Sequence, residues 1–154
     1  MEDAAYVSGF VDGEGSFLVS FQMRSKMATG VEVRPSFTIS QHQRNRQILD
    51  WIQRYFGCGS IRFNKRDQTF KYEVRSLDDL LLKVAPHFKQ YPLKTSKSKD
   101  FESFKNICKL MKEGQHLSRD GIVKIFDLAY GMNNLGARRY DKRSLLQMVS
   151  KLKV

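Results

Sequence analysis

The sequence predicts an α+β fold in which four antiparallel strands share one sheet, with further helices after them. Two pairs of short segments alternate apolar and polar residues, as half-buried strands do. Between and after these pairs, apolar residues recur at the three- and four-residue spacing of helices. The chain has 154 residues, of which 41% are hydrophobic, so it can bury a core. No linker or low-complexity segment divides it, and a single domain over residues 1–154 is expected.

The first ninety residues are expected to run helix, hairpin, helix, hairpin, helix. The expected elements are a helix over residues 6–12, strands over 17–24 and 31–40, a helix over 48–56, strands over 61–63 and 70–74, and a helix over 80–88. Glycines at positions 13, 15 and 57 are expected to end the first two helices. Asp78 or Asp79 can cap the third, and Pro86 or Pro92 is expected to end it.

The rest of the chain is predicted to be helical. One apolar stripe starts at Phe101, and a second follows Ser118, which is a plausible helix cap. The stripes consist of Phe101, Phe104, Ile107, Cys108 and Met111, and of Ile122, Ile125, Phe126 and Ala129. A last short helix is expected around Leu145, Leu146 and Val149.

The composition favours a polyanionic partner and excludes several other classes. Lys and Arg number 27 against 16 Asp and Glu, which gives a formal charge of +11, and nucleic acid is the first partner to consider. The longest apolar run, at residues 80–82, is too short for a membrane span, and no apolar block of signal-peptide type opens the chain. Cys58 and Cys108 form no metal or disulfide pattern, which fits a reducing compartment.

The solvent faces of the predicted strands carry side chains of the kinds that read base edges. Arg and Lys suit guanine, Gln and Asn suit adenine, and Glu accepts from cytosine. A two-stranded ribbon fits the major groove of DNA, whereas the alternative is an ordinary wet sheet face. The residues on these faces are Ser20, Gln22, Arg24, Lys26, Glu32, Arg34, Ser36, Thr38, Ser40, Arg62, Asn64, Arg66, Thr69, Lys71, Glu73 and Arg75. Alternation alone leaves the two readings about even, and the scarcity of acids favours DNA.

The segment Val7-Ser8-Gly9-Phe10-Val11-Asp12-Gly13-Glu14-Gly15 resembles the LAGLIDADG motif of homing endonucleases. It departs from that motif at Val7 and Ser8, and it has Glu14 where Asp is commoner. The resemblance implies the LAGLIDADG fold, whose four-stranded sheet forms a DNA-binding saddle. It also implies a site-specific homing endonuclease, a hydrolase encoded in an intron.

Small residues recur every four positions along this motif, at Ala5, Gly9 and Gly13. Another helix backbone could approach such a face closely, so we expect a dimer interface of Ala5, Ser8, Gly9, Asp12 and Gly13. A small-residue helix packed inside a monomer fits the stripe almost as well. Only one copy of the motif is present, and single-motif members of the family act as homodimers. A twofold dimer is expected to prefer a palindromic or pseudo-palindromic target.

Asp12 and Glu14 lie at the negative end of the predicted helix dipole, and a dimer would bring in a second set. Converging carboxylates need a compensating cation, and oxygen ligands beside substrate phosphates suit Mg²⁺. We expect Glu14 and Gly13 to hold the metal and Asp12 to support the helix end by capping. Mn²⁺ is expected to substitute for Mg²⁺, and Ca²⁺ to bind without supporting cleavage.

The resemblance extends to two further catalytic residues. Gln41 matches the polar residue at the end of the family's second strand that helps to order the hydrolytic water. Lys97 matches the active-site lysine, by its distance from Phe101, ahead of Lys94 and Lys99. The alternatives are that Gln41 only ends a strand and that any of the lysines only contacts the DNA backbone. The basic residues Arg138, Arg139, Lys142 and Arg143 are expected to make nonspecific phosphate contacts.

The preferred hypothesis is a Mg²⁺-dependent homodimer that makes a staggered double-strand break in a long pseudo-palindromic DNA target. A cleavage-deficient, sequence-specific DNA-binding protein is the second hypothesis, and an intron RNA maturase on the same fold is the third. The histidines lie in no HExxH motif and the sequence has no GxSxG motif. No membrane and no small-molecule cofactor are expected, and the location is expected to be intracellular, in an organelle-encoded or prokaryotic cytoplasmic setting.

Overall fold

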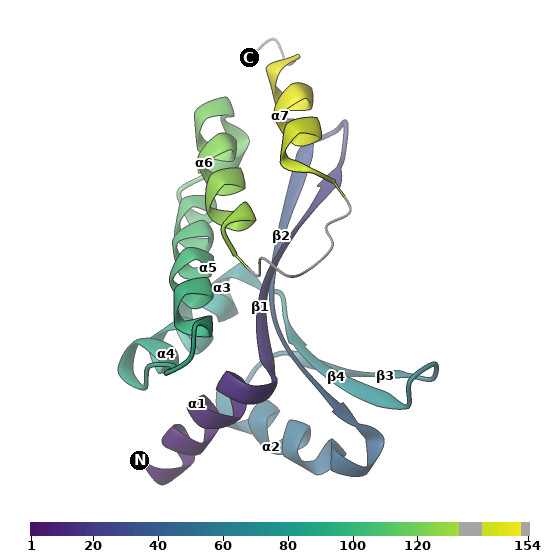
Figure 1. Cartoon of the computed structure of the whole chain (residues 1–154), viewed down its shortest axis with the longest axis vertical. Helices are drawn as coiled ribbons and strands as arrows, with labels where there is room; N and C mark the ends of the chain where they lie inside the picture. Colours follow the sequence, from purple (N-terminus) through teal and green to yellow (C-terminus); the bar gives the residue numbers. More distant parts are fainter. Residues whose placement is uncertain (133–139, 152–154) are drawn as a thin grey trace. The chain divides into compact units, whose positions relative to one another are not determined.

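The computed structural model describes residues 1–132 and 140–151 and has the expected α+β architecture (Figure 1). Its four-stranded sheet has the order β1-β2-β4-β3. The elements are α1 (Glu2–Glu14), β1 (Gly15–Met23), β2 (Val31–His42), η1 (Gln43–Asn45), α2 (Arg46–Phe56), β3 (Ser60–Asn64), β4 (Thr69–Val74), α3 (Leu77–Asp79), η2 (Leu80–Val84), α4 (Ala85–Gln90), α5 (Lys97–Lys112), η3 (Gln115–Leu117), α6 (Arg119–Tyr130) and α7 (Lys142–Ser150). Among the described residues, no helix combines the length and apolar character that crossing a membrane requires.

Contacts divide the chain into two compact units. The first consists of Met1–Phe17 and Ser36–Ser98, and the second of Leu18–Pro35 and Lys99–Val154. Each unit is described by itself below. The single domain expected from the sequence stays a prediction.

The first unit is built around an aromatic core. Alternation along β2 and β4 sends one set of side chains inward, and the antiparallel register pairs Phe37 with Val74 and Ile39 with Tyr72. The ring centroid of Phe37 lies 5.2 Å from that of Phe17 and 5.7 Å from that of Phe88. In Figure 1, α1 and α2 lie side by side. The aromatic core of the first unit thus joins β2 to the start of β1 and to α4.

The second unit packs the far part of the β1–β2 hairpin with its own helices. The hairpin closes through a hydrogen bond from Arg24 N to Gly30 O (2.8 Å). Phe21 lies 5.0 Å from the ring of Phe126 and 6.1 Å from that of Tyr130 on α6. Ser118 caps α6 by accepting from the N–H of Gly121 (3.1 Å), as the sequence predicts.

The first helix extends beyond the predicted residues 6–12 at both ends. Glu2 and Asp3 stand in its first turn, where carboxylates favour the helix dipole. Gly13 does not end the helix but lies inside it, and Gly15 is where it stops. A Cβ at Gly15 would come within 2.7 Å of Val11 Cγ1, so this position needs glycine for close packing.

The third predicted helix differs most from the expectation. Its cap is Ser76, which accepts from Asp79 N (3.3 Å), so the predicted capping by Asp78 or Asp79 is wrong. Pro86 does not end the helix either, because it lies in the first turn of α4, directly after the π-helical turn η2. The wider π-helical turn relieves the clash between the proline ring and the carbonyl of the preceding turn. Because proline has no N–H, its place in the first turn of α4 also leaves no backbone donor without a partner.

Some strand positions also depart from strict alternation. Met23 is 41% exposed at the end of β1, although alternation with the buried Phe17, Val19 and Phe21 would place it on the buried face. Ser36 and Thr38, predicted on the solvent face, are buried. They belong to β2, a central strand whose short side chains lie between those of its neighbours.

Candidate active site at the end of the first helix

Three residues that the sequence assigns to catalysis come together at the C-terminal end of α1, all within the first unit. Glu14 is the last residue of α1, and its Oε2 accepts from Gln41 Nε2 on β2 (3.0 Å). Lys97, the first residue of α5, donates from Nζ to the carbonyl oxygens of Val11 (2.8 Å) and Asp12 (2.9 Å). A cation at the end of a helix is favourable because the carbonyl dipoles point toward it.

Asn45 sets the orientation of the Gln41 side chain. A carboxylate only accepts, so Gln41 must turn its NH₂ toward Glu14 and its oxygen away. That oxygen, Oε1, receives a hydrogen bond from Asn45 Nδ2 (3.3 Å). Asn45 is not among the site residues predicted from the sequence, where its position four residues after Gln41, just past the strand, is the only sign of a contact.

Asp12 turns away from Glu14 and holds the loop that precedes α5. Its carboxylate accepts from Lys94 N (2.7 Å), Thr95 N (3.2 Å) and Thr95 Oγ1 (2.7 Å). Burial alone raises the pKa of Asp12, but the hydrogen bonds and the charge of Lys97 outweigh it, so the pKa lies below the ordinary value. Asp12 thus anchors the loop before α5 to the end of α1, and its predicted role of capping the helix end stays a prediction.

The three candidate lysines differ in what they bring to this site. Lys97 reaches the end of α1 with its ammonium group. Lys94 meets Asp12 through its backbone N–H. Lys99 belongs to the second unit. This geometry favours Lys97 over Lys94.

One face of α1 is open. Ideal Cβ atoms at Gly9 and Gly13 would meet no atom within 4 Å, and Ala5 is exposed on the same stripe. Tyr6 beside it is 52% exposed and stacks on Phe10, with ring centroids 6.1 Å apart. Among residues 1–132 and 140–151, no helix or strand covers the stripe of Ala5, Gly9 and Gly13.

Ser8, predicted at the dimer interface, faces the interior of its own chain. Its hydroxyl is buried, donates to Tyr91 O (2.7 Å) and lies 3.0 Å from His87 Nε2. Tyr55 OH lies 3.0 Å from the other ring nitrogen. Because the Ser8 proton is used on Tyr91, His87 Nε2 donates to Ser8, so this pair is not an activated nucleophile.

A hollow of about 330 Å³ adjoins Gln41 between α1 and the start of α2. Its lining combines two aromatic rings with amide and guanidinium groups. The lining residues are Tyr6, Phe10, Gln41, Arg44, Asn45, Gln47 and Ile48. The polar groups that line this hollow together with Gln41 are of the kinds that bind water or phosphate.

The predicted DNA-reading residues fall into two groups. Twelve lie in strands: Ser20, Gln22, Glu32, Arg34, Ser36, Thr38, Ser40, Arg62, Asn64, Thr69, Lys71 and Glu73. Four lie outside them: Arg24, Lys26, Arg66 and Arg75, where the backbone turns and alternation no longer assigns a face. In the first unit, the register pairs Lys71 with both Ser40 and Arg62, so these three share one face.

Acidic residues on the strands are paired with basic ones. Glu32 lies 2.9 Å from Arg24 and 3.0 Å from Arg34, and Glu73 lies 3.4 Å from Lys71. Such partly exposed pairs contribute little to stability. They hold the basic side chains in defined positions on the strand surface.

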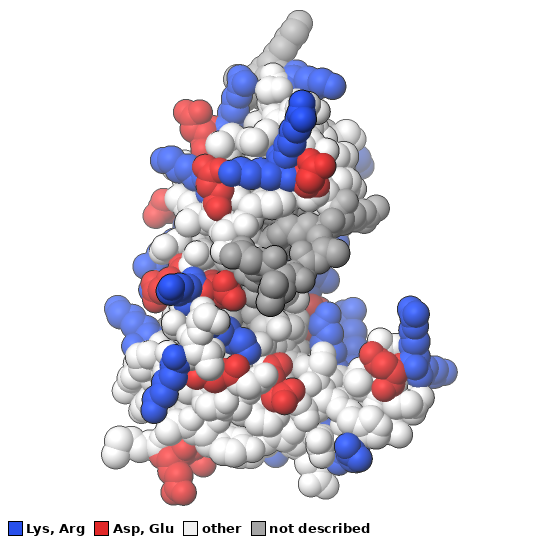
Figure 2. Space-filling view, in the orientation of Figure 1, with Lys and Arg blue, Asp and Glu red and all other residues white. Residues whose placement is uncertain are grey.

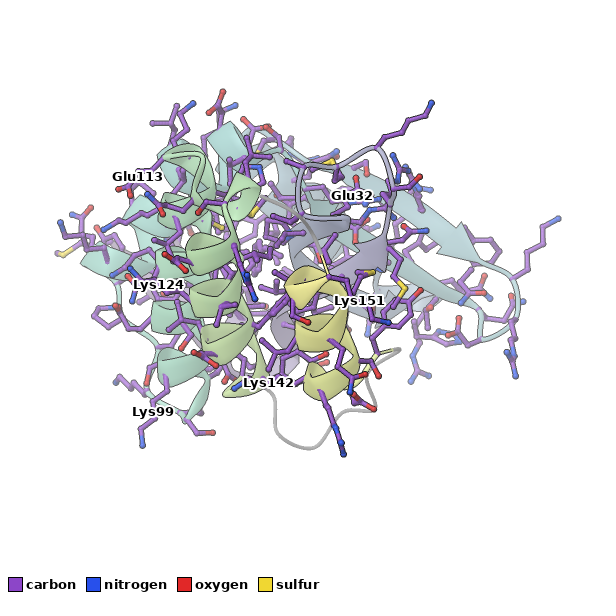
Figure 3. The ribbon with its side chains drawn as sticks, turned by 90° about the horizontal axis from the view of Figure 1, so that it is seen from above. Glu32, Lys99, Glu113, Lys124, Lys142 and Lys151 are labelled. Carbon is purple, nitrogen blue, oxygen red and sulfur yellow. The ribbon has the colours of Figure 1, made fainter. Side chains whose placement is uncertain are left out.

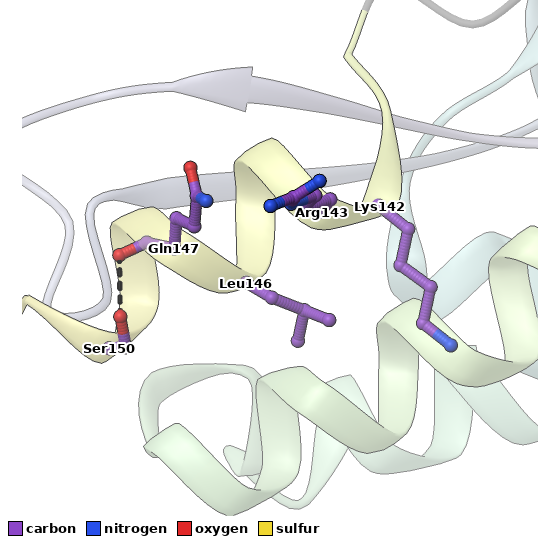
Figure 4. Close-up of a pocket in the computed structure, with 5 residues that line it drawn as sticks. All are labelled: Lys142, Arg143, Leu146, Gln147 and Ser150. Carbon is purple, nitrogen blue, oxygen red and sulfur yellow. Dashed lines mark hydrogen bonds between the residues drawn. The ribbon is translucent and has the colours of Figure 1, made fainter.

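Lys and Arg side chains are interspersed with acidic ones on the face drawn in Figure 2. Lys142, labelled in Figure 3, lies at the start of α7 and pairs with Asp127 of α6 (2.5 Å). Arg138 and Arg139, predicted phosphate contacts, lie outside the described residues. A hollow of about 610 Å³ along α7 is lined by Lys142, Arg143, Leu146, Gln147 and Ser150 (Figure 4), and no predicted catalytic residue lines it.

The donor atoms at the end of α1 are of the kind that a hard divalent cation takes. Glu14 presents an exposed carboxylate, and Gly13 next to it is exposed as well. Within the described residues, no group of three or more His, Cys, Asp and Glu side chains could hold a metal ion. Glu14 and Gly13 therefore suit one half of a divalent-cation site, whose remaining ligands would be other oxygen donors.

A sequence model described as LAGLIDADG endonuclease matches residues 7–108. A curated relative, probable intron-encoded endonuclease 3 of Neurospora crassa, is 33% identical over 127 residues, which are 82% of this chain and 24% of that protein. Homing endonuclease I-ApeII of Aeropyrum pernix is 27% identical over 94% of this chain and 86% of its own length. The chain spans only about a quarter to a half of the length of three fungal relatives that it matches.

Two solved structures match nearly the whole chain. The homing endonuclease I-TnaI is 36% identical with a TM-score of 0.83, over 97% of both chains. The archaeal intron-encoded homing endonuclease I-Vdi141I, complexed with DNA, is 30% identical with a TM-score of 0.90, over 99% of this chain and 98% of the other. The fold predicted from the sequence is thereby confirmed.

Proposed function

The chain belongs to the LAGLIDADG endonuclease family, and from this we propose that it is a site-specific homing endonuclease. Its substrate is double-stranded DNA, in which it makes a staggered break at a long pseudo-palindromic target. The observation that carries the proposal is the meeting of Glu14, Gln41 and Lys97 at the end of α1. The likeness of the whole chain to a homing endonuclease complexed with DNA supports it.

In this proposal, Glu14 and the Gly13 carbonyl hold a divalent ion, Mg²⁺ by preference, because oxygen donors with few protein carboxylates suit that ion. When bound, the ion polarises the scissile phosphate and activates water. Mn²⁺ is expected to replace it, and Ca²⁺ to bind without supporting cleavage. The exposed position of Glu14 at the end of α1 leaves its carboxylate accessible to DNA.

Gln41 and Lys97 act on the reacting atoms from two sides. The Gln41 amide, held between Glu14 and Asn45, orients the carboxylate and the hydrolytic water beside it. The Lys97 ammonium stabilises negative charge that develops on the phosphate during the displacement. Neither the orientation of water by Gln41 nor the stabilisation of charge by Lys97 requires Lys97 to lose its proton.

A second copy of the chain supplies the other half of the enzyme. The open stripe of Ala5, Gly9 and Gly13 suits close helix–helix contact between two copies. Each copy brings one Glu14, so a dimer has one set of catalytic residues for each DNA strand. Its twofold symmetry requires two related half-sites.

The polar face of the sheet reads the target in the major groove. The face shared by Ser40, Arg62 and Lys71 offers both hydrogen-bond donors and acceptors to base edges. We propose that the two sheets of the dimer together form the saddle on which the duplex lies. Since the substrate is DNA, the protein is proposed to act inside the cell, in an organelle or in prokaryotic cytoplasm.

The test begins with a plasmid library of randomised sequence, incubated with the protein and Mg²⁺, and the ends produced are sequenced. On the target found, Glu14→Gln should lower the single-turnover cleavage rate about a thousandfold or more. Its affinity for the target should stay close to that of the unaltered protein, because the amide keeps the shape of the side chain. The matched control is Glu113→Gln, another exposed acid, which should cleave normally.

Each other outcome has a clear meaning. Full cleavage by Glu14→Gln would remove Glu14 from the metal site. Tight, sequence-specific DNA binding with no cleavage by the unaltered protein would establish the binding-only alternative. Binding restricted to an intron RNA, with no DNA target recovered, would establish the maturase alternative.

A further inference from the structure

The end of α1 and the start of α5 exchange hydrogen bonds in both directions. From α1, the Asp12 carboxylate accepts from the N–H groups of Lys94 and Thr95 and from the Thr95 hydroxyl. From α5, the Lys97 ammonium donates to the carbonyls of Val11 and Asp12. The side chain of each segment therefore satisfies backbone groups of the other.

Thr95 connects Asp12 at the end of α1 to Lys97 at the start of α5. Its Oγ1 donates to Asp12 Oδ1 (2.7 Å) and accepts from Lys97 N (3.3 Å). Its carbonyl accepts from Ser98 N (3.0 Å), which closes the backbone turn that leads into α5. One hydroxyl thus fixes where α5 starts relative to α1, and with it the origin of the Lys97 side chain.

We propose that Thr95 is a positioning residue for Lys97. Its hydroxyl holds the Lys97 backbone at the distance from which the ammonium reaches the carbonyl oxygens of Val11 and Asp12 at the end of α1. A small displacement of a group that stabilises a transition state has a large effect on rate. This inference rests on the proposed nuclease function, in which Lys97 acts on the phosphate.

The test compares three substitutions in the full-length protein. Thr95→Val keeps the shape but loses both hydrogen bonds, and it should lower the single-turnover cleavage rate about ten- to hundredfold. Affinity for the DNA target should change little. Thr95→Ser keeps the hydroxyl and should restore most of the rate. Ser96→Ala, at the exposed neighbouring residue, is the control and should behave as the unaltered protein.

Epistasis separates positioning from general destabilisation. In a Lys97→Ala background, Thr95→Val should lower the residual rate no further, because the group that it positions is absent. A further loss equal to that in the unaltered background would overturn the inference. So would a Thr95→Ser variant as slow as Thr95→Val.

A second readout does not depend on cleavage. The side-chain ¹⁵N resonance of Lys97, assigned from its loss in Lys97→Arg, should move toward the resonances of exposed lysines in Thr95→Val and stay in place in Thr95→Ser. An unchanged resonance in Thr95→Val would overturn the inference. If the unaltered protein cut no DNA while this resonance moved as expected, the nuclease proposal would fail and the positioning by Thr95 would stand.

Discussion

Two acidic side chains at the end of α1 have opposite surroundings, although only Gly13 separates them. Residues two apart on a helix point in different directions. Asp12 therefore turns to the loop before α5 and accepts three hydrogen bonds, whereas Glu14 is exposed and meets Gln41. One acid holds the structure together, and the other is available for chemistry.

His87 is a second residue whose surroundings fix its protonation. Burial lowers its pKa to about 4, while an unfolded histidine has a pKa of about 6.5. The unfolded state therefore binds a proton that the folded state does not, and stability is lost as pH falls below about 6.5 toward 4. Between pH 7 and pH 5 the loss from His87 should be about 2 kcal/mol.

Urea unfolding at both pH values measures this loss. His87→Gln, which does not titrate, should show a smaller decrease in the free energy of unfolding between pH 7 and pH 5 than the unaltered protein. An equal decrease in both proteins would show that His87 does not contribute to the pH dependence. Measuring the difference between the two proteins cancels the contributions of the carboxylates.

The residues proposed for catalysis could be identified in the sequence to the extent that a motif carries them, and the structure brings them to the end of α1. Glu14 and Gln41 follow from the motif and from the strand after it, and Lys97 from its distance to Phe101. Asn45 and Thr95 were not predictable, because they act through hydrogen bonds that only the folded chain brings about. The same holds for Ser8, whose partners His87 and Tyr91 lie about eighty residues away.

At the scale of the element, the periodicity of apolar residues predicts the helices and strands. The residue types expected to end these elements predict some of the ends wrongly. Gly57 ends α2 in the left-handed conformation (φ 66°), as its position after the apolar stripe predicts. Gly13 carries the same signal, yet the helix continues through it. Burial of Val7 and Val11 against the rest of the first unit outweighs the weak helix propensity of a single glycine.

The turn before α6 depends on a glycine that the sequence did not single out. A Cβ on Gly121 would collide with the carbonyl oxygen of Gln115 and lie 2.8 Å from the capping hydroxyl of Ser118. Gly121→Ala should therefore lower the free energy of unfolding by about 3 kcal/mol, since the backbone of Gln115 cannot move freely. Thermal or urea unfolding measures it.

The matched control is Gly131→Ala at the other end of α6, where the nearest atoms lie at 3.5 and 3.6 Å. That substitution should change stability by less than about 0.5 kcal/mol. Equal effects at the two positions would contradict the steric account. An intact Gly121→Ala variant would mean that the turn rearranges at little cost.

At the scale of the whole molecule, positive charge is unevenly shared along the chain. The second unit has 15 Lys and Arg against seven acidic residues, and the first has 12 against nine. Nonspecific attraction to DNA is therefore expected to come mostly from the second unit. The residues proposed for chemistry, in contrast, all belong to the first unit.

Assembly of two copies is the whole-molecule property that the proposed function needs. Gly9→Leu places a large side chain where the isolated chain has open space, so the variant should fold normally. In analytical ultracentrifugation it should sediment as a monomer at concentrations where the unaltered protein is a dimer, because the two helices can no longer approach closely.

Lys89→Leu, at an exposed position of α4, is the control for added apolar surface and should remain dimeric. A Gly9→Leu variant that still sediments as an intact dimer would place the interface elsewhere. Circular dichroism of both variants should match that of the unaltered protein.

Because Asp12 and Glu14 have different roles, DNA cleavage could be lost while the fold is kept. With Glu14 in its proposed role, a single nucleotide change in its codon would silence cleavage while every contact that anchors the loop before α5 persists. The silenced protein would still recognise its site and would act there as a roadblock or a repressor. Losing Asp12 offers no such path, because the loop before α5 would lose its anchor and the position of Lys97 would change with it.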